Sequence, residues 1–92
     1  MTNDPKQVKP FLPSSAQTRG ARAMIGWSQV DLATASGLSG PTVKRFETEG
    51  APVSDEAIAK MRYALEAAGV IFLAEGETRD GGQGVRLRGN PK

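Results

Sequence analysis

The fold is decided by residues 29–46, which read QVDLATASGLSGPTVKRF. Two helices that cross at a wide angle need a small residue where they touch, and Ala33 is small. The tight turn between them needs a residue that tolerates a positive φ, and Gly37 meets that need. Leu38 can fill the corner, and Val43 then faces the core from the second helix. The stretch therefore predicts two helices joined by a tight turn, the helix-turn-helix arrangement.

Capping signals mark the ends of both helices. Ser28 is a favoured N-cap for the first helix. The second helix should begin after Ser39, with Pro41 in its first turn, where a missing N–H costs nothing. It is expected to run to about Glu49 and to stop at Gly50.

Another helix is predicted before this pair, from about Ser15 to Ile25. Ser14 followed three residues later by Gln17 is a capping-box pattern, and Gly26 suits a left-handed helix end. Five small or apolar residues fall on one face of this helix: Ala16, Gly20, Ala23, Met24 and Trp27.

A further helix is predicted to open at Ser54 and to end at Gly69. Asp55 and Glu56 in its first turn complement the helix dipole. Its inner face is expected to consist of six apolar residues at helical spacing: Ala57, Ile58, Met61, Ala64, Leu65 and Ala68.

The pattern changes after Gly69. Residues Val70–Leu73 are consecutive apolar residues typical of a strand, and Val85–Arg88 alternate apolar and basic residues like a second strand. A glycine-rich, charged loop separates the two segments. This part of the chain therefore predicts a β-hairpin with a long tip.

The predicted fold is mainly α, with a four-to-five-helix domain over residues 14–69. A β-hairpin and tail are expected over residues 70–92. Residues 1–13 contain three prolines among polar neighbours and are expected to form a flexible arm. Phe11 and Leu12 either dock on the domain or remain part of a solvated tail.

The composition excludes several kinds of chemistry. The 92 residues suit one domain with a small core, and they include no cysteine and no histidine. No metal, cofactor or catalytic residue is therefore expected. The formal net charge of +2, with a pI near 9.3, is a mild indication of a polyanionic partner. The first thirty residues lack an apolar run suited to a signal peptide or a membrane span, so we expect a cytoplasmic protein without membrane contact.

Residues 22–50, RAMIGWSQVDLATASGLSGPTVKRFETEG, resemble the helix-turn-helix of Cro and phage-repressor-type regulators, the Xre-like family. With the helix that follows, the resemblance covers residues 15–69. Its most specific parts are the Trp27-Ser28-Gln29 opening and the Arg45-Phe46-Glu47 step. The tail is similar to that of small bacterial regulators that end in a hairpin. The resemblance implies a repressor-like fold and double-stranded DNA as the partner.

The resemblance also implies roles for individual residues. Gln29 matches a position that contacts the phosphate backbone. Arg22 and Glu47 match an ion pair that ties the helix predicted at about Ser15 to Ile25 to the helix that begins after Ser39. The exposed positions of the recognition helix are matched by Gly40, Pro41, Lys44 and Arg45. Family members often carry Arg, Gln or Ser where this chain has Gly40 and Pro41, which offer no side-chain hydrogen bond to a base edge.

The candidate DNA-binding residues are Gln29, Ser39, Gly40, Pro41, Thr42, Lys44 and Arg45. Arg45 is the better base reader, because a guanidinium can bridge guanine O6 and N7, and Lys44 suits a phosphate. Thr42 either caps its own helix or touches the DNA. The plainer alternatives are a solvated helix face for the two cations and a polar residue beside a cap for Gln29.

Basic residues outside this set have open roles. Lys6 and Lys9 of the arm either enter a minor groove, as other basic arms do, or stay in solvent. Arg79, Arg86 and Arg88 either reach flanking phosphate or form a solvated strand face.

Two functions remain open at the level of sequence. The first is sequence-specific DNA binding by a dimer at an inverted repeat, which regulates transcription. The second is a protein-interaction module, such as an antitoxin or an antiactivator, on the same scaffold. The modest net charge and the Gly40-Pro41 pair keep the second function open. An enzyme is disfavoured, since the sequence offers no set of general acid, base and nucleophile.

The hairpin predicts a homodimer through residues 70–88. Four consecutive apolar residues cannot hide both faces of a strand within one small domain, and an isolated hairpin is marginal in water. One face is expected on the last helix, against Leu65 and Ala68, with the other face or the open edge on a second copy. The alternative is a hairpin folded on its own domain in a monomer that dimerises only on DNA.

Overall fold

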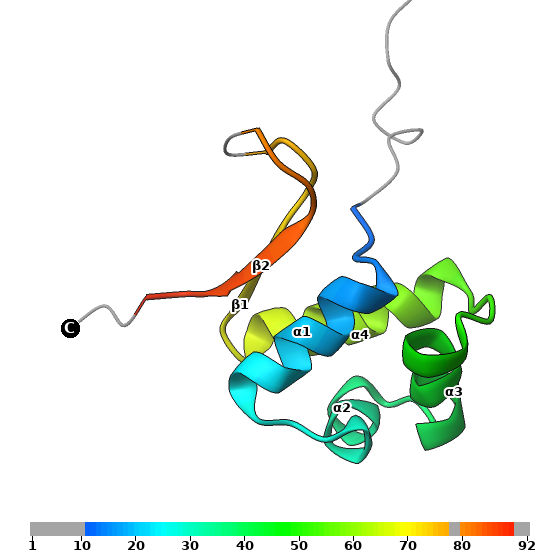
Figure 1. Ribbon diagram of the computed structural model, residues 1–92. Coiled ribbons are helices and arrows are strands. Elements are labelled where there is room, and N and C mark those ends of the chain that lie inside the picture. The colour runs from blue at the N-terminus through cyan, green and yellow to red at the C-terminus, as the bar shows by residue number, and fades with distance from the viewer. Residues whose placement is uncertain (1–10, 78–79, 90–92) are drawn as a thin grey trace, which may run out of the picture.

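The computed structural model describes residues 11–77 and 80–89. These residues are mainly helical and end in a two-stranded antiparallel hairpin, as the sequence predicts (Figure 1). The elements in chain order are α1 (Ser15–Ile25), α2 (Gln29–Ser36), α3 (Gly40–Lys44), the π-helical turn η2 (Arg45–Glu49), α4 (Asp55–Ala67), β1 (Val70–Leu73) and β2 (Gly84–Leu87). Figure 1 shows the hairpin projecting from the helical body on the side away from α3.

The predicted caps of α1 and α2 are confirmed. The Ser14 hydroxyl accepts the N–H of Gln17, and the Gln17 side chain accepts the N–H of Ser14 in return. Ser28 caps α2 in the same reciprocal way. Both helices end at a glycine in the left-handed region, with φ of 74° at Gly26 and 77° at Gly37.

The helix after Ser39 was predicted to run to about Glu49, but its α-helical part, α3, is shorter. The α-helix ends at Lys44, and the chain continues as the π-helical turn η2 before Gly50 ends it with φ of 64°. The Arg45 carbonyl accepts the N–H groups of both Gly50 and Ala51, so one wide turn satisfies this helix end. The predicted stop at Gly50 is therefore correct, although the backbone reaches it through a wider turn.

The core lies between the helices and β1, and includes Ala21 of α1 and Val70 and Phe72 of β1. Leu32, Val43, Met61 and Leu65 are completely buried there, and Ala33 is buried beside them. On α4 the buried positions Ala57, Met61 and Leu65 belong to the predicted inner face. Ala68 is exposed, because it is the C-cap at which the chain leaves the helix, so its predicted contact with the hairpin is wrong.

The buried face of α1 differs from its apolar face. Gln17, Thr18 and Ala21 are buried, whereas Ala16 and Ala23 are exposed and Met24 is 42% exposed. The polar side chains are buried without cost because they are hydrogen-bonded, with the Thr18 hydroxyl donating to the Ser14 carbonyl. Ala16, Ala23 and Met24 of the predicted face are therefore left on the surface, whereas Ala21 joins the core.

The hairpin packs on two helices, with β1 against α4 and β2 against α1. Val70 lies opposite Leu87 and Phe72 opposite Val85. The second strand covers Gly84–Leu87, one residue earlier than the predicted Val85–Arg88.

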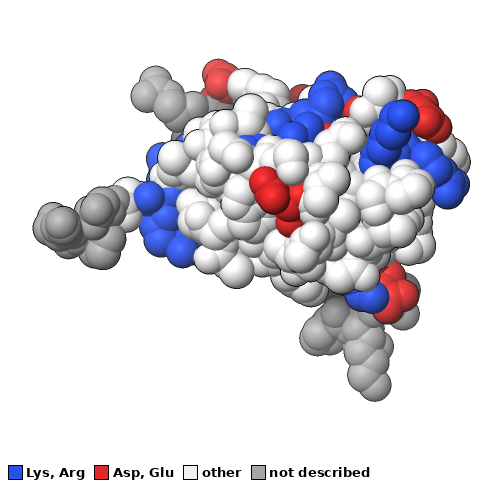
Figure 2. Space-filling view, turned by 90° about the horizontal axis from the view of Figure 1, so that it is seen from below, with Lys and Arg blue, Asp and Glu red and all other residues white. Residues whose placement is uncertain are grey.

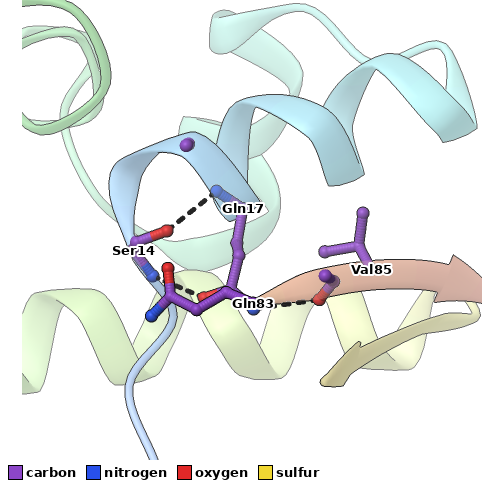
Figure 3. Close-up of a pocket in the computed structure, with 6 residues that line it drawn as sticks. Ser14, Gln17, Gln83 and Val85 are labelled. Carbon is purple, nitrogen blue, oxygen red and sulfur yellow. Dashed lines mark hydrogen bonds between the residues drawn. The ribbon is translucent and has the colours of Figure 1, made fainter. Parts of the chain in front are cut away.

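Gln17 ties α1 to the hairpin (Figure 3). Its side-chain amide nitrogen donates to the Leu73 carbonyl at 3.0 Å and to the Gly84 carbonyl at 2.9 Å. These two residues are paired across the hairpin, so a single amide holds the tip ends of both strands. The capping box of α1 fixes the same side chain from the other side.

Phe11 docks on the domain, which settles the alternative left open for it. Its ring lies 6.3 Å from that of Phe72, and the Arg62 guanidinium lies 5.6 Å from the Phe11 ring centroid. Arg62 also donates to the Phe11 carbonyl at 2.7 Å. Residues 1–10, including Lys6 and Lys9 of the predicted arm, lie outside the described residues.

Candidate functional site

α2 and α3 are joined by a short turn that fixes their relative position. Gly37 ends α2, and the N–H of Leu38 donates to the Ala33 carbonyl at 3.0 Å. Ser39 then caps α3 by accepting the N–H of Thr42. Val43 is completely buried, so this side of α3 faces the core and the opposite side faces solvent.

Five of the predicted site residues line one open hollow between α2 and α3. The hollow has a volume of about 520 Å³, and the predicted residues on its wall are Gln29, Gly40, Pro41, Lys44 and Arg45. Lys44 and Arg45 are both exposed. The structure therefore brings residues from two helices to a single surface, which we call the α2–α3 surface.

Ser39 and Thr42 are not on the wall of that hollow. Their hydroxyls are 2.8 Å apart, and the Ser39 hydroxyl also accepts the Thr42 N–H at 3.2 Å. The Thr42 side chain thus bonds to Ser39, the cap of its own helix, and its contact with DNA stays a prediction.

Gln29 is engaged within the protein. Its side-chain amide nitrogen donates to the Glu47 carboxylate at 3.2 Å and to the Thr48 hydroxyl at 3.3 Å. The amide has two N–H donors, and these two bonds use both. A contact from this side chain to a phosphate would require one of the bonds to break.

The ion pair implied for Arg22 and Glu47 is present. Arg22 donates from Nε to both carboxylate oxygens of Glu47, at 3.0 and 2.9 Å, and from Nη2 to one of them at 2.7 Å. Its Nη1 donates to the Trp27 carbonyl. The Glu47 side chain is 0% exposed and that of Arg22 is 18% exposed. Glu47 is thus a structural carboxylate that ties η2 to α1.

Sequence reasoning missed two residues beside the α2–α3 surface. Val30 lines the same hollow and is 69% exposed, although it is apolar. Arg19 is exposed on α1 and donates to the backbone carbonyl of Glu47. Its spacing of three residues from Arg22 places both on one side of α1, which is the signal that could have identified it.

The charge on this side of the molecule is mixed. Lys44 and Arg45 share the wall of the hollow with the acidic Glu49, and Asp31 is exposed on α2. Figure 2, which views the molecule from below α2 and α3 as they appear in Figure 1, shows basic side chains in separate groups near the margin. The centre of that face is mostly uncharged with one acidic group.

Of the basic cluster predicted on the hairpin, Arg86 and Arg88 are exposed, and Arg79 lies outside the described residues. Within residues 11–77 and 80–89 no acidic, histidine or cysteine side chains gather in a group of three that could hold a metal ion. None of the helices in the part of the chain that the structure describes is both long and apolar enough to span a bilayer. No protein-family model and no curated protein matches the chain.

Proposed function

We propose that the protein is a helix-turn-helix regulator of transcription with a repressor-like fold. It binds an inverted-repeat operator in double-stranded DNA as a homodimer joined through residues 70–88. The proposal is carried by one observation: α3 buries Val43 while Gly40, Pro41, Lys44 and Arg45 remain together on an open surface.

The arrangement of α2 and α3 supports this function. A recognition helix must rest on the core along one side and present the other side to the major groove, which admits an α-helix. The Gly37 turn and the Ser39 cap support this role, because they hold α3 with Val43 on the core and its other side in solvent. The ion pair between Arg22 and Glu47 fixes the far end of the same helical segment against α1.

Arg45 and Lys44 have different roles in DNA binding. Arg45 reads a guanine through paired hydrogen bonds, and Lys44 binds a phosphate. Gly40 and Pro41 allow close approach of the backbone but offer no side-chain donor. Specificity therefore rests on few base contacts and on the shape of the DNA.

One observation favours a second function, a protein-interaction module such as an antitoxin or antiactivator. Val30 and Pro41 place apolar side chains on the wall of the same hollow, and Val30 is 69% exposed. Exposed apolar surface rimmed by polar residues is typical of protein-binding sites. In this function Glu49 and the two cations form a polar rim around the partner.

A titration separates the two functions. Duplex DNA from the region upstream of the protein's own gene is titrated with the protein at about 50 mM and about 200 mM salt, and a shuffled duplex is the control. DNA binding predicts preference for the upstream duplex and a marked loss of affinity at the higher salt. Equal, weak binding of both duplexes contradicts the proposal and favours the second function.

A further inference from the structure

The backbone of β2 has an open edge. In an antiparallel ladder, pairs that exchange hydrogen bonds alternate with pairs whose N–H and C=O groups point to the outside. The N–H of Arg88 donates to the Gly69 carbonyl at 2.7 Å, which fixes the phase of this ladder. The backbone groups of Val85 and Leu87 therefore point away from β1, along the free edge of β2.

The two edges of the hairpin differ in exposure. On β1 the outward-pointing backbone groups belong to Val70 and Phe72, which are 1% and 7% exposed, and Phe11 packs against Phe72. On β2 the corresponding residues are Val85, which is half-buried, and Leu87, which is 44% exposed. An exposed strand edge is a template for pairing with another chain. Of the two strand edges that the structure describes, that of β2 is the more exposed and offers such a template.

An apolar face of α1 lies beside this edge. A Cβ atom built on Gly20 would be 3.7 Å from the Val85 side chain, and Ala16 lines a pocket together with Val85. Figure 1 shows α1 and β2 running in the same direction. From Gln17 to Met24 the helix rises about 10 Å, and from Gly84 to Leu87 the strand advances about 10 Å. The exposed Met24 is therefore level with the exposed Leu87.

We propose that the β2 edge pairs antiparallel with the β2 edge of a second copy of this chain. The two hairpins then form a four-stranded sheet in the order β1-β2-β2-β1. Both helical bodies lie on the same side of that sheet, and the exposed apolar residues of α1 are covered by the other copy. This inference deepens the homodimer of the proposed function by naming its surface.

Charge selects the register of the pairing. Val85 and Leu87 must lie opposite residues of the partner subunit whose backbone groups also point outward, which are the odd-numbered residues of β2 and its continuations. The two-fold axis therefore passes beside a single residue, and the positions within β2 are 84, 85, 86 and 87. An axis at 86 places Arg86 opposite Arg86 of the partner subunit, and an axis at 87 places it opposite Arg88 of the partner subunit. Like charges directly opposite each other destabilise a sheet.

The two remaining registers, with the axis at 84 or 85, differ in the backbone conformation of the partner residues that lie opposite β2. An axis at 84 places β2 opposite Gly81 and Gly82 of the partner subunit, which lie outside the strand, and Gly81 lies in a bend with a positive φ. An axis at 85 pairs residues 84–86 of both copies within β2, places Leu87 opposite Gln83 just before the partner strand, and places Arg86 opposite Gly84 of the partner subunit. The dimer therefore has its two-fold axis at Val85.

Cross-linking tests the register, and the absence of cysteine from the chain makes the test clean. Gly84→Cys and Arg86→Cys both place a thiol on the outer face of the hairpin, and a Cβ at Gly84 has only ordinary contacts. Each variant alone should stay uncrosslinked under mild oxidation, and their mixture should give a disulfide-linked dimer. Cross-linking of Arg86→Cys alone, or none in the mixture, overturns the proposed register.

A proline at position 87 tests the edge itself. Leu87→Pro removes an N–H that points away from β1, so the hairpin keeps its own ladder and the monomer keeps its fold. Light scattering should give twice the monomer mass for the wild type and for the control Leu87→Thr, and the monomer mass for Leu87→Pro. A folded Leu87→Pro dimer overturns the interface. DNA binding is measured separately, so a dimer that binds no DNA contradicts the proposed function and leaves the interface standing.

Discussion

At the scale of single residues, Glu47 is the one charged residue that is buried in the part of the chain that the structure describes. Its carboxylate is completely buried, and it accepts hydrogen bonds from Arg22 and Gln29. Its neighbour Glu49 is exposed on the wall of the hollow. Two acidic residues of the same turn thus have different environments, as the resemblance implied when it matched only Glu47 to an ion pair with Arg22.

Glu47→Ala should destabilise the fold by about 3–5 kcal/mol, because it leaves the Arg22 guanidinium without its partner. Chemical denaturation measures the loss, with Glu49→Ala as the matched control at within about 0.5 kcal/mol of the wild type. Glu47→Gln, which retains one acceptor oxygen, should fall between the two. A Glu47→Ala protein that unfolds like the wild type and yet binds no DNA would show that Glu47 acts at the interface instead.

Lys44 and Arg45 provide a second matched comparison. Arg45→Ala should weaken binding to a specific duplex by about 1–3 kcal/mol and relax the preference at one base pair. Lys44→Ala should weaken all duplexes alike and lower the salt slope by about one. Anisotropy titrations of cognate and mutated duplexes measure both effects. Unchanged affinity of Arg45→Ala for the cognate duplex contradicts its assignment as base reader.

At the scale of elements, local signals predicted the helix ends well, and tertiary contacts decided the rest. The caps at Ser14 and Ser28 and the left-handed glycines depend on neighbouring residues only, so the sequence contains all the information they need. The buried face of α1 was predicted only in part: Trp27 packs against the core, but Gln17 is buried through bonds to Leu73 and Gly84, which are far away in the chain. The π-helical turn η2 had no recognisable signal in the residue pattern.

Gly37→Ala tests the turn between α2 and α3. Gly37 has φ of 77°, a conformation that costs a residue with a Cβ about 1–2 kcal/mol. Gly40→Ala is the matched control, since Gly40 lies in α3 without a positive φ and a Cβ there meets nothing within 4 Å. Thermal unfolding should show a lower Tm for Gly37→Ala and an equal or higher Tm for Gly40→Ala. Equal melting of both variants would contradict the role given to the turn.

At the scale of the whole molecule, the sequence predicted the location of the candidate site residues better than the hydrogen bonds and exposure of their side chains. The helical spacing of Val43 placed Lys44 and Arg45 outward, and the structure agrees. The internal bonds of Gln29 and the exposure of Val30 depend on how α2 meets η2, which no local pattern specifies. Which edge of the hairpin is exposed also depends on tertiary contacts, because Phe11 packs against Phe72 of β1 and leaves the edge of β2 open.

The central claim is that two α2–α3 surfaces read one duplex together. Selection of duplexes from a random-sequence library by the purified protein, followed by sequencing, tests it most directly. The account predicts enrichment of an inverted repeat with half-site centres about one helical turn, or a multiple of it, apart. It also predicts that the Arg45→Ala protein loses the preference at one position in each half-site. Recovery of no enriched sequence, or of an unrepeated site that Arg45→Ala recognises equally well, would contradict the account.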